Sequence, residues 1–183
     1  MAAESAVEIH DWTPAWAEEF RARAAVLRSA LGDRAARIDH IGSTSIVGLA
    51  AKPIVDIQVS VADFEPFAPL EAAMTGAGYV LRRDNPELTK RYFRELPRTK
   101  RCHVHIRRLG SWHEQWALLF RDYLRGRPEV CAAYEGLKRE LAARHRSDPQ
   151  AYTDAKGDFF WAAIRDADQW AGDTGWRPGP SDA

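Results

Sequence analysis

The sequence predicts an α/β (α+β) fold with an N-terminal helix, a mixed α/β middle and a helical C-terminal third. Two observations support this prediction: apolar residues recur every three to four positions near both ends of the chain, and β-branched residues concentrate between them. Apolar residues make up 45% of the 183 residues, which is enough for a buried core. We expect one domain over residues 1–171 and a disordered tail over residues 172–183.

The first helix is predicted from Pro14 to Leu31. Thr13 can cap it, and proline at position 14 suits the first helical position. Gly32 and Asp33 then end the helix. Its apolar stripe, at spacings near three and four, contains Trp12, Trp16, Phe20, Leu27 and Leu31.

The middle of the chain carries the strand signals. The strongest is Pro53–Val61, where apolar side chains alternate with polar ones. Because neighbouring residues of a strand point to opposite faces, Asp56, Gln58 and Ser60 share one face. The other elements expected here are strands at Arg37–Ile41, Tyr79–Arg83, Arg91–Glu95 and Cys102–Arg107, and a helix at Phe67–Thr75.

From Trp112 onward, apolar residues recur every three to four positions, which is the spacing of a helix with one apolar face. We expect three helices, marked by apolar residues within 112–123, 130–141 and 152–170. Glycine and proline at 126–128 and a polar stretch with proline at 146–149 separate them.

Overall charge and the chain start exclude several classes of partner. The 26 Lys and Arg balance 26 Asp and Glu, so nucleic acid and an anionic membrane surface are not expected partners. Met1–Ser5 lacks the basic and apolar regions of a leader, and no stretch is apolar enough to span a membrane. Cys102 and Cys131 form no zinc-type cluster. We therefore expect a cytoplasmic protein without membrane contact, of undetermined subunit number.

Positive charge is nevertheless concentrated in one stretch. Residues 80–108 contain ten Lys and Arg against three Asp and Glu. One interpretation is a hairpin with a basic, solvated face, and the other is a wall that binds an anion. The sequence favours neither.

The turn after the strand Arg37–Ile41 is the first candidate for chemistry. Gly42, Ser43 and Thr44 open a tight turn at a predicted helix start, where free backbone N–H groups and the Ser43 hydroxyl can hold a phosphate. Asp56 and Gln58 follow on one face of the next strand, where a divalent cation that bridges phosphates could bind. An ordinary turn and a capping Asp also explain this pattern.

The whole segment HIGSTSIVGLAAKPIVDIQV, residues 40–59, resembles the signature of the GrpB family. The Trp-rich segment 12–16 is similar to the start of that family's first helix, and Phe120–Leu124 is similar to its Phe-Arg-Asp-Tyr-Leu helix. The resemblance covers about residues 10–170. It extends to the His-x-His strand at His103 and His105, and to the Tyr and Lys pairs Tyr134 with Lys138 and Tyr152 with Lys156.

This resemblance implies a fold and an activity. GrpB-like proteins resemble the nucleotidyltransferase fold shared with DNA polymerase beta, and the same domain occurs fused behind some bacterial dephospho-CoA kinases. It implies a mixed sheet with flanking helices and a cleft beside the Gly42-Ser43 turn. In catalytic members of that superfamily, Gly-Ser binds nucleotide phosphates, and an Asp-x-Asp strand with a third carboxylate binds two Mg²⁺ ions.

This chain departs from that pattern in its metal ligands. Gln58 replaces the second carboxylate, and the later strand offers His103 and His105 instead of an acid. Amide and imidazole groups bind Mg²⁺ weakly, whereas imidazole with carboxylate suits Mn²⁺ or Zn²⁺. We expect at most a single divalent ion, Mg, Mn or Zn, held by Asp56 and His105 with His103 and Gln58 as further candidate ligands. The alternative is that both histidines are ordinary polar residues in a cleft.

Basic side chains supply the remaining candidates. Lys52 follows the turn and can reach a phosphate there. Lys138 and Lys156 each follow a tyrosine by four residues, which lets the lysine stem pack on the ring and the ammonium point into a cleft. The family resemblance favours Lys156, with Asp56, as a catalytic residue. Surface exposure is the alternative for every one of these, including the candidate anion ligands Arg91, Arg94 and Arg121.

Three hypotheses of function follow. The first is a protein that binds a nucleotide or another phosphorylated small molecule in a basic cleft and transfers a nucleotidyl group to an acceptor. The second is a non-catalytic domain that binds a phosphorylated cofactor such as a coenzyme A precursor. The third is an interaction module in which the turn is only structural.

Overall fold

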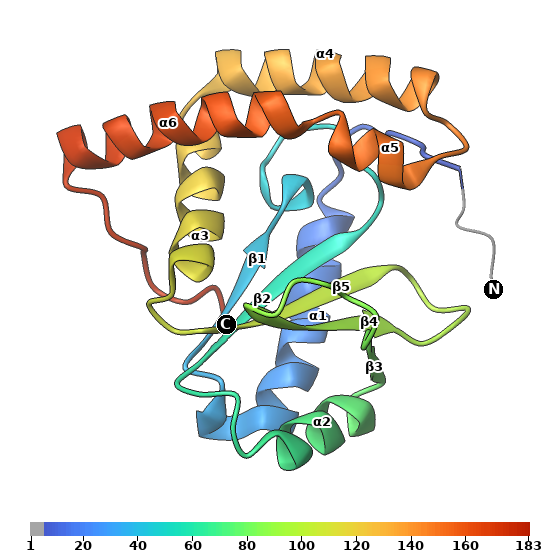
Figure 1. Ribbon diagram of the computed structural model, residues 1–183, viewed down its shortest axis with the longest axis vertical. Coiled ribbons are helices and arrows are strands. Elements are labelled where there is room, and N and C mark those ends of the chain that lie inside the picture. The colour runs from blue at the N-terminus through green and yellow to red at the C-terminus, as the bar shows by residue number, and fades with distance from the viewer. Residues whose placement is uncertain (1–5) are drawn as a thin grey trace.

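The computed structural model, which describes residues 6–183, contains a five-stranded mixed sheet with helices on both faces (Figure 1). The predicted mixed sheet flanked by helices is therefore confirmed. Met1–Ser5, where we expect no leader, lie outside the described residues. The strand order is β1-β2-β5-β4-β3, with β1 Arg37–Ile41, β2 Val55–Val61, β3 Tyr79–Leu81, β4 Lys90–Glu95 and β5 Cys102–Arg108.

The strands pair in a register that decides where the polar side chains meet. β2 and β5 run parallel, whereas β1–β2, β5–β4 and β4–β3 are antiparallel. Asp56 lies opposite His103, and Gln58 lies opposite His105. On the other side of β5, Arg94 lies opposite His103. Side chains at paired positions project to the same face of a sheet.

One face of the sheet is apolar and carries the main core. The helices α1 (Ala15–Leu31) and α2 (Phe67–Gly76) cover it. The bounds of both helices agree with the predicted ranges to within one residue. The core they form with the strands includes Phe20, Leu27, Ile57, Val59, Leu70, Met74, Phe93, Val104 and Ile106.

The opposite face of the sheet is polar and lies beneath the C-terminal helices. These are α3 (Trp112–Arg125), α4 (Pro128–Arg144), α5 (Pro149–Asp154) and α6 (Gly157–Thr174). Of these, α3, α4 and α6 pack on one another and on Ile46 and Leu49 of the loop before β2, forming a second core. Figure 1 shows α4, α5 and α6 together beyond the end of the sheet where this loop lies. None of the helices described in residues 6–183 is both long and apolar enough to cross a membrane.

Two features of the C-terminal third differ from the sequence prediction. The helix expected over residues 152–170 is divided into α5 and α6. Gly157, a weak helix former, stands at the start of α6, and Tyr152 of α5 is buried in a separate cluster with Val7 and Leu141. The tail was expected to be disordered from residue 172, but it has a defined structure. The helix α6 continues to Thr174, and residues after it contact β1.

The tail contacts β1 because it supplies hydrogen-bond partners to an edge strand. Ile38 N–H donates to Ser181 Oγ at 2.8 Å, and His40 N–H donates to Asp182 Oδ2 at 2.9 Å. Asp182 also pairs at 2.8 Å with Arg121, whose side chain is buried. Asp122 also lies 2.8 Å from Arg121. The sequence made Arg121 a candidate anion ligand, but in the structure its guanidinium pairs with carboxylates of its own chain.

Candidate metal and phosphate site

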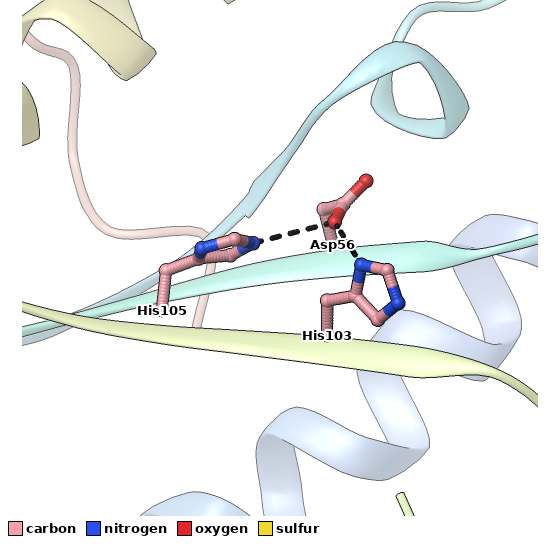
Figure 2. A group of neighbouring side chains, drawn as sticks. All are labelled: Asp56, His103 and His105. Atoms are coloured by element: carbon pink, nitrogen blue, oxygen red, sulfur yellow. Dashed lines mark hydrogen bonds and ion pairs between the residues drawn. The ribbon is translucent and has the colours of Figure 1, made fainter. Parts of the chain in front are cut away.

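A cluster of one carboxylate and two imidazoles lies on the polar face of the sheet. Asp56 Oδ1 is 3.3 Å from His103 Nδ1 and 3.4 Å from His105 Nε2. Figure 2 shows both rings, from one strand, pointing toward the carboxylate of the neighbouring strand. The ligand atoms of the three side chains all lie within 4.8 Å of one another. The sequence placed these residues on two candidate strands, and the parallel pairing of β2 with β5 brings them together.

Tyr92 holds the two rings in place from β4. Its ring stacks on His105, with centroids 5.1 Å apart, and meets His103 edge-on at 5.5 Å. Tyr92 is paired with His105 in the β4–β5 register, so all three rings lie on the same face. Sequence reasoning missed Tyr92. The alternation of Tyr92 and Arg94 along the strand was visible, but their pairing with the two histidines was not.

The electrostatics of the cluster favour an ionised carboxylate. Burial by itself raises the pKa of Asp56, but hydrogen bonds from His103 and His105 outweigh it and hold this pKa well below its ordinary range. Burial lowers the pKa of His105, and its hydrogen bond to Asp56 opposes that effect. A negatively charged oxygen therefore faces two imidazole nitrogens. A metal ion would take the place of these N–H···O hydrogen bonds, so its binding requires that the nitrogens facing Asp56 give up their protons.

The donor set suits a transition-metal ion better than Mg²⁺. Two ligands about 2.0–2.1 Å from a tetrahedral zinc ion stand about 3.3 Å apart, which matches the two separations from Asp56 Oδ1. Two imidazoles and one carboxylate leave further coordination positions for a ligand oxygen. The other ring nitrogen of His103, Nε2, is not the one directed at Asp56; it is buried and has no hydrogen-bond partner within residues 6–183. The residues present thus fit one ion of the Zn²⁺ or Mn²⁺ type.

The Gly42-Ser43 turn lies directly against this cluster. Gly42 has φ +71° and ψ −179°, a conformation that favours glycine. A Cβ atom at this position would lie 2.6 Å from Asp56 Oδ2. The turn closes with Ser45 Oγ donating to the Gly42 carbonyl at 2.6 Å, and Ser43 hydrogen-bonds with Tyr134. Gly42 therefore allows the backbone to approach the carboxylate.

Two lysines approach the cluster from the side of the helices. The ammonium groups of Lys52 and Lys156 lie 5.0 and 4.5 Å from the centre of the Tyr152 ring. Burial, followed by repulsion from Lys52, lowers the pKa of Lys156 to about 8, while attraction to Asp56 opposes this shift. Both lysines would therefore attract an anion bound at Asp56.

Four other predicted site residues make contacts of their own within the chain. Gln58 is fully buried on the same face of the sheet, opposite His105; its Nε2 donates to the Glu114 carbonyl at 3.1 Å, and its Oε1 has no hydrogen-bond partner within residues 6–183. Thr44 donates to the Ile54 carbonyl. Lys138 is buried and donates to the Ala50 carbonyl. Arg91 lies on the opposite face of β4, with its guanidinium 4.2 Å from the centre of the Phe64 ring.

Arg94 does lie beside the cluster, at the wall of a cleft. The cleft has a volume of about 300 Å³. Lys52, Arg82, Arg101 and His103 line it as well, so the basic stretch of residues 80–108 contributes charge to this face. Sequence reasoning counted Arg82 and Arg101 in that stretch but did not select them as site residues.

The fold and this cluster define a class of protein: an α/β domain with a two-histidine, one-carboxylate cluster beside a Gly-Ser turn. The family model described as "GrpB protein" matches residues 6–166. The chain belongs to the GrpB family.

Similar proteins agree with this assignment. UPF0157 protein SCO7215 of Streptomyces coelicolor is 40% identical over 156 residues, which is 85% of this chain and 81% of that protein. UPF0157 protein YqkA of Bacillus subtilis is 35% identical over 90% of this chain and 48% of its own length. A dephospho-CoA kinase of Mycolicibacterium paratuberculosis is 34% identical over 90% of this chain and 47% of its own length. This chain therefore spans about half the length of the last two relatives.

A solved structure has the same fold. The crystal structure of the conserved protein GrpB from Enterococcus faecalis superposes with a TM-score of 0.82 at 32% identity. The match covers 89% of this chain and 99% of that one. The order of helices and strands is thus that of a known member of the family.

Proposed function

We propose that this protein binds a nucleotide or another phosphorylated small molecule through one divalent metal ion, and transfers a nucleotidyl group from it to an acceptor. The observation that carries the proposal is the proximity of three features: the Asp56, His103 and His105 cluster, the Gly42-Ser43 turn against it, and Lys156, whose pKa is lowered by burial but raised by attraction to Asp56 and which has Lys52 beside it. Metal ligands, backbone N–H donors and lysines are what phosphoryl chemistry needs in one place.

Each part has a distinct role in this proposal. Asp56, His103 and His105 hold the ion, which neutralises charge on phosphate oxygens when it is bound. The Ser43 hydroxyl and the backbone N–H groups at the start of the turn would donate to a phosphate oxygen. The N–H groups of Ser45 and Ile46 already donate to the Gly42 and Ser43 carbonyls. Lys52 and Lys156 offset the charge of the leaving group. In the transfer, the hydroxyl oxygen of the acceptor bonds to the α-phosphorus of a nucleoside triphosphate and its proton passes to solvent, the bond from that phosphorus to the bridging oxygen breaks, and pyrophosphate leaves.

Lys156 has a property suited to this role. Because burial and Lys52 lower its pKa to about 8, a proton can leave or return near neutral pH more readily than from an exposed lysine. An anion that binds between the two lysines would favour their charged forms. We therefore propose Lys156 and Asp56 as the catalytic residues.

The test compares wild type with Asp56→Asn. Calorimetric titration with ATP in MnCl2, ZnCl2, MgCl2 or EDTA measures whether the nucleotide needs the metal, and ATP labelled at the α-phosphate measures transfer to a panel of small-molecule acceptors. We expect Mn²⁺-dependent or Zn²⁺-dependent binding that Asp56→Asn abolishes and that Asp33→Asn, at an exposed site, preserves. Nucleotide binding that is equal in EDTA and in Asp56→Asn would contradict the proposal.

A second function is favoured by a separate observation. The cluster contains one carboxylate, because the position of a second is taken by Gln58, which is committed to α3. A site with a single acid suits ligand binding without two-metal catalysis. Relatives named dephospho-CoA kinase make a coenzyme A precursor a reasonable ligand for such a domain. Dephospho-CoA binding that persists in EDTA and in Asp56→Asn, without transfer of label, would establish this function instead.

A further inference from the structure

The C-terminal tail, residues 175–183, crosses the edge of the sheet and takes no part in the proposed reaction. It follows the region, residues 6–166, that matches the family model. The tail runs from the end of α6 past α3 to β1 (Figure 1). Trp176 Nε1 donates to Asp122 Oδ2 of α3 at 3.2 Å. At the other end, Arg28 of α1 donates to the Ala183 carbonyl at 2.9 Å. The tail therefore joins helices that lie on opposite faces of the sheet.

Hydrogen bonds to backbone groups dock the tail on the outer edge of β1. Ile38 N–H donates to Ser181 Oγ at 2.8 Å, and Ala183 N–H donates to the Ile38 carbonyl at 3.1 Å. His40 N–H donates to Asp182 Oδ2 at 2.9 Å. Since β1 is an edge strand, these backbone groups have no neighbouring strand to pair with. Asp182 and Ala183 are themselves exposed, so polar contacts and not apolar burial hold this part of the tail.

Asp182 and Arg121 together hold both backbone groups of His40. Asp182 Oδ2 accepts from the His40 N–H and, at 2.8 Å, from Arg121 Nη1. The same Nη1 donates to the His40 carbonyl at 3.3 Å. The Arg121 side chain is buried and also pairs with Asp122, so it offers Asp182 a fixed partner. One ion pair thus binds the N–H and the C=O of the same residue of β1.

His40 leads directly into the turn of the proposed phosphate site. Gly42 follows two residues later, and a Cβ atom there would lie 2.6 Å from Asp56 Oδ2. The His40 ring also reaches the turn, because its Nε2 lies 3.0 Å from Thr44 Oγ1. The same ring stacks on Phe20, with centroids 4.8 Å apart. A shift of the His40 backbone would therefore move the turn relative to the carboxylate.

We propose that Asp182 is a positioning residue for the Gly42-Ser43 turn, and that docking of the tail on β1 is coupled to binding of a phosphate there. The ion pair with Arg121 places Asp182, which holds the backbone of His40, and His40 sets the path of the chain into the turn. Such coupling is reciprocal, so a lifted tail weakens phosphate binding and a bound phosphate favours the docked tail. This proposal deepens the proposed function and rests on it.

The experiment compares Asp182→Ala with Asp182→Asn in the full chain, by calorimetric titration of ATP in MnCl2. Asparagine keeps an oxygen that can accept from the His40 N–H and from Arg121, whereas alanine keeps none. We expect Asp182→Ala to weaken ATP binding by at least about fivefold, and Asp182→Asn to keep most of the affinity. Both variants leave Arg121 with one carboxylate fewer, so both should lose stability in urea denaturation. Asp173→Ala, at an exposed position of α6, should change neither quantity.

A second measurement needs no ligand. Hydrogen exchange without metal or nucleotide, followed by mass spectrometry over residues 38–46, reports the turn through the N–H groups of Ser45 and Ile46, which bond within it. We expect faster exchange in Asp182→Ala than in Asp182→Asn or wild type. Should Asp182→Ala not fold, Ser181→Ala, which removes the other side-chain acceptor for the β1 backbone, replaces it in both measurements.

The outcomes separate this proposal from the one on which it rests. Wild-type affinity for ATP in Asp182→Ala would overturn the coupling while metal-dependent binding stands. Equal losses of affinity in Asp182→Ala and Asp182→Asn, in step with their losses of stability, would also overturn it, because they would show general destabilisation. If ATP binds the wild type with no metal tested, the proposed function fails. Faster exchange in Asp182→Ala than in Asp182→Asn would then still support the positioning of the turn, and equal exchange would overturn it.

Discussion

Gly42 lies so close to Asp56 that a single added methyl group would meet the carboxylate, with the new Cβ 2.6 Å from Oδ2. Gly42→Ala also places a side chain on a residue with φ +71°. We expect the variant to lose about 1–3 kcal/mol of unfolding free energy from the backbone strain. We also expect loss of Mn²⁺ binding, because the methyl group displaces the carboxylate.

Gly48→Ala is the matched control for this prediction. Gly48 also has a positive φ, +82°, but an added Cβ would meet no atom within 4 Å. Both variants should lose stability in chemical denaturation, and only Gly42→Ala should lose Mn²⁺ affinity in calorimetry. Equal Mn²⁺ affinity in the two variants would show that the contact with Asp56 does not position the carboxylate.

Tyr92 should act on the metal site through ring packing and not through its hydroxyl. Its ring contacts both His103 and His105, so Tyr92→Ala leaves both imidazoles without support. We expect Tyr92→Ala to lower Zn²⁺ affinity by about 10–100-fold, the range found for groups that orient metal ligands. Tyr92→Phe keeps the ring and should retain wild-type affinity. A similar loss in both variants would instead assign the effect to the hydroxyl.

Lys138 should give the stability of the protein a specific dependence on pH. Burial, followed by repulsion from Lys156, lowers the pKa of Lys138 from 10.5 to about 7. Below pH 7 the lysine is charged in both the folded and the unfolded state, so the full cost of burying the charge is present. Between about pH 7 and 10.5 only the unfolded state keeps the proton, so stability rises with pH by about 1.4 kcal/mol per unit.

Lys138→Met removes this contribution. We expect the unfolding free energy of the variant, relative to wild type, to fall as pH rises from about 7 to 10.5, measured by urea denaturation across that range. Lys156 titrates in both proteins, so the comparison subtracts most of its effect. Parallel stability curves for the two proteins would contradict the assignment.

The buried Arg121 should be a major determinant of stability. It pairs with Asp122 and Asp182 at 2.8 Å and lies 3.6 Å from the fully buried Asp39. Arg121→Met leaves these carboxylates short of a cation, and we expect a loss of about 3–5 kcal/mol in chemical denaturation. Arg139→Met, an exposed arginine that also has two carboxylate partners, should change stability by no more than about 0.5 kcal/mol. A small loss for Arg121→Met would mean that Arg37 alone stabilises Asp39.

Most of the fold could be predicted because local patterns determine its elements. The alternation in Val55–Val61 and the apolar stripe of Ala15–Leu31 appear in the sequence at the periods that the structure has. The division at residues 155–156 and the docked tail could not be predicted. Both depend on contacts with distant residues, such as Asp182 with Arg121, which no local pattern reveals.

The site was predictable as a set of residues but not as a geometry. Asp56, His103 and His105 were selected because carboxylate and imidazole groups are metal ligands, and the register places them together. Gln58 was selected because it shares a strand face with Asp56, and the position of α3 gives its amide nitrogen a partner in the Glu114 carbonyl. The pairing of β4 with β5 decides which side chains of β4 share a face with the histidines. The sequence does not show this pairing, so Arg91 was included and Tyr92 was missed.

The parallel pairing of β2 with β5 has a consequence for how the protein folds. Parallel strands need a crossover, and here α2, β3 and β4 lie between Asp56 and His103 in the chain. Contacts between such distant segments form slowly, because a long loop must close before they are gained. Asp56, His103 and His105 therefore come together only when the centre of the sheet is complete, and the unfolded chain does not contain this cluster. A metal ion that binds there would report the finished sheet, and it would raise the melting temperature by an amount that grows with the logarithm of the free metal concentration once that concentration exceeds the dissociation constant.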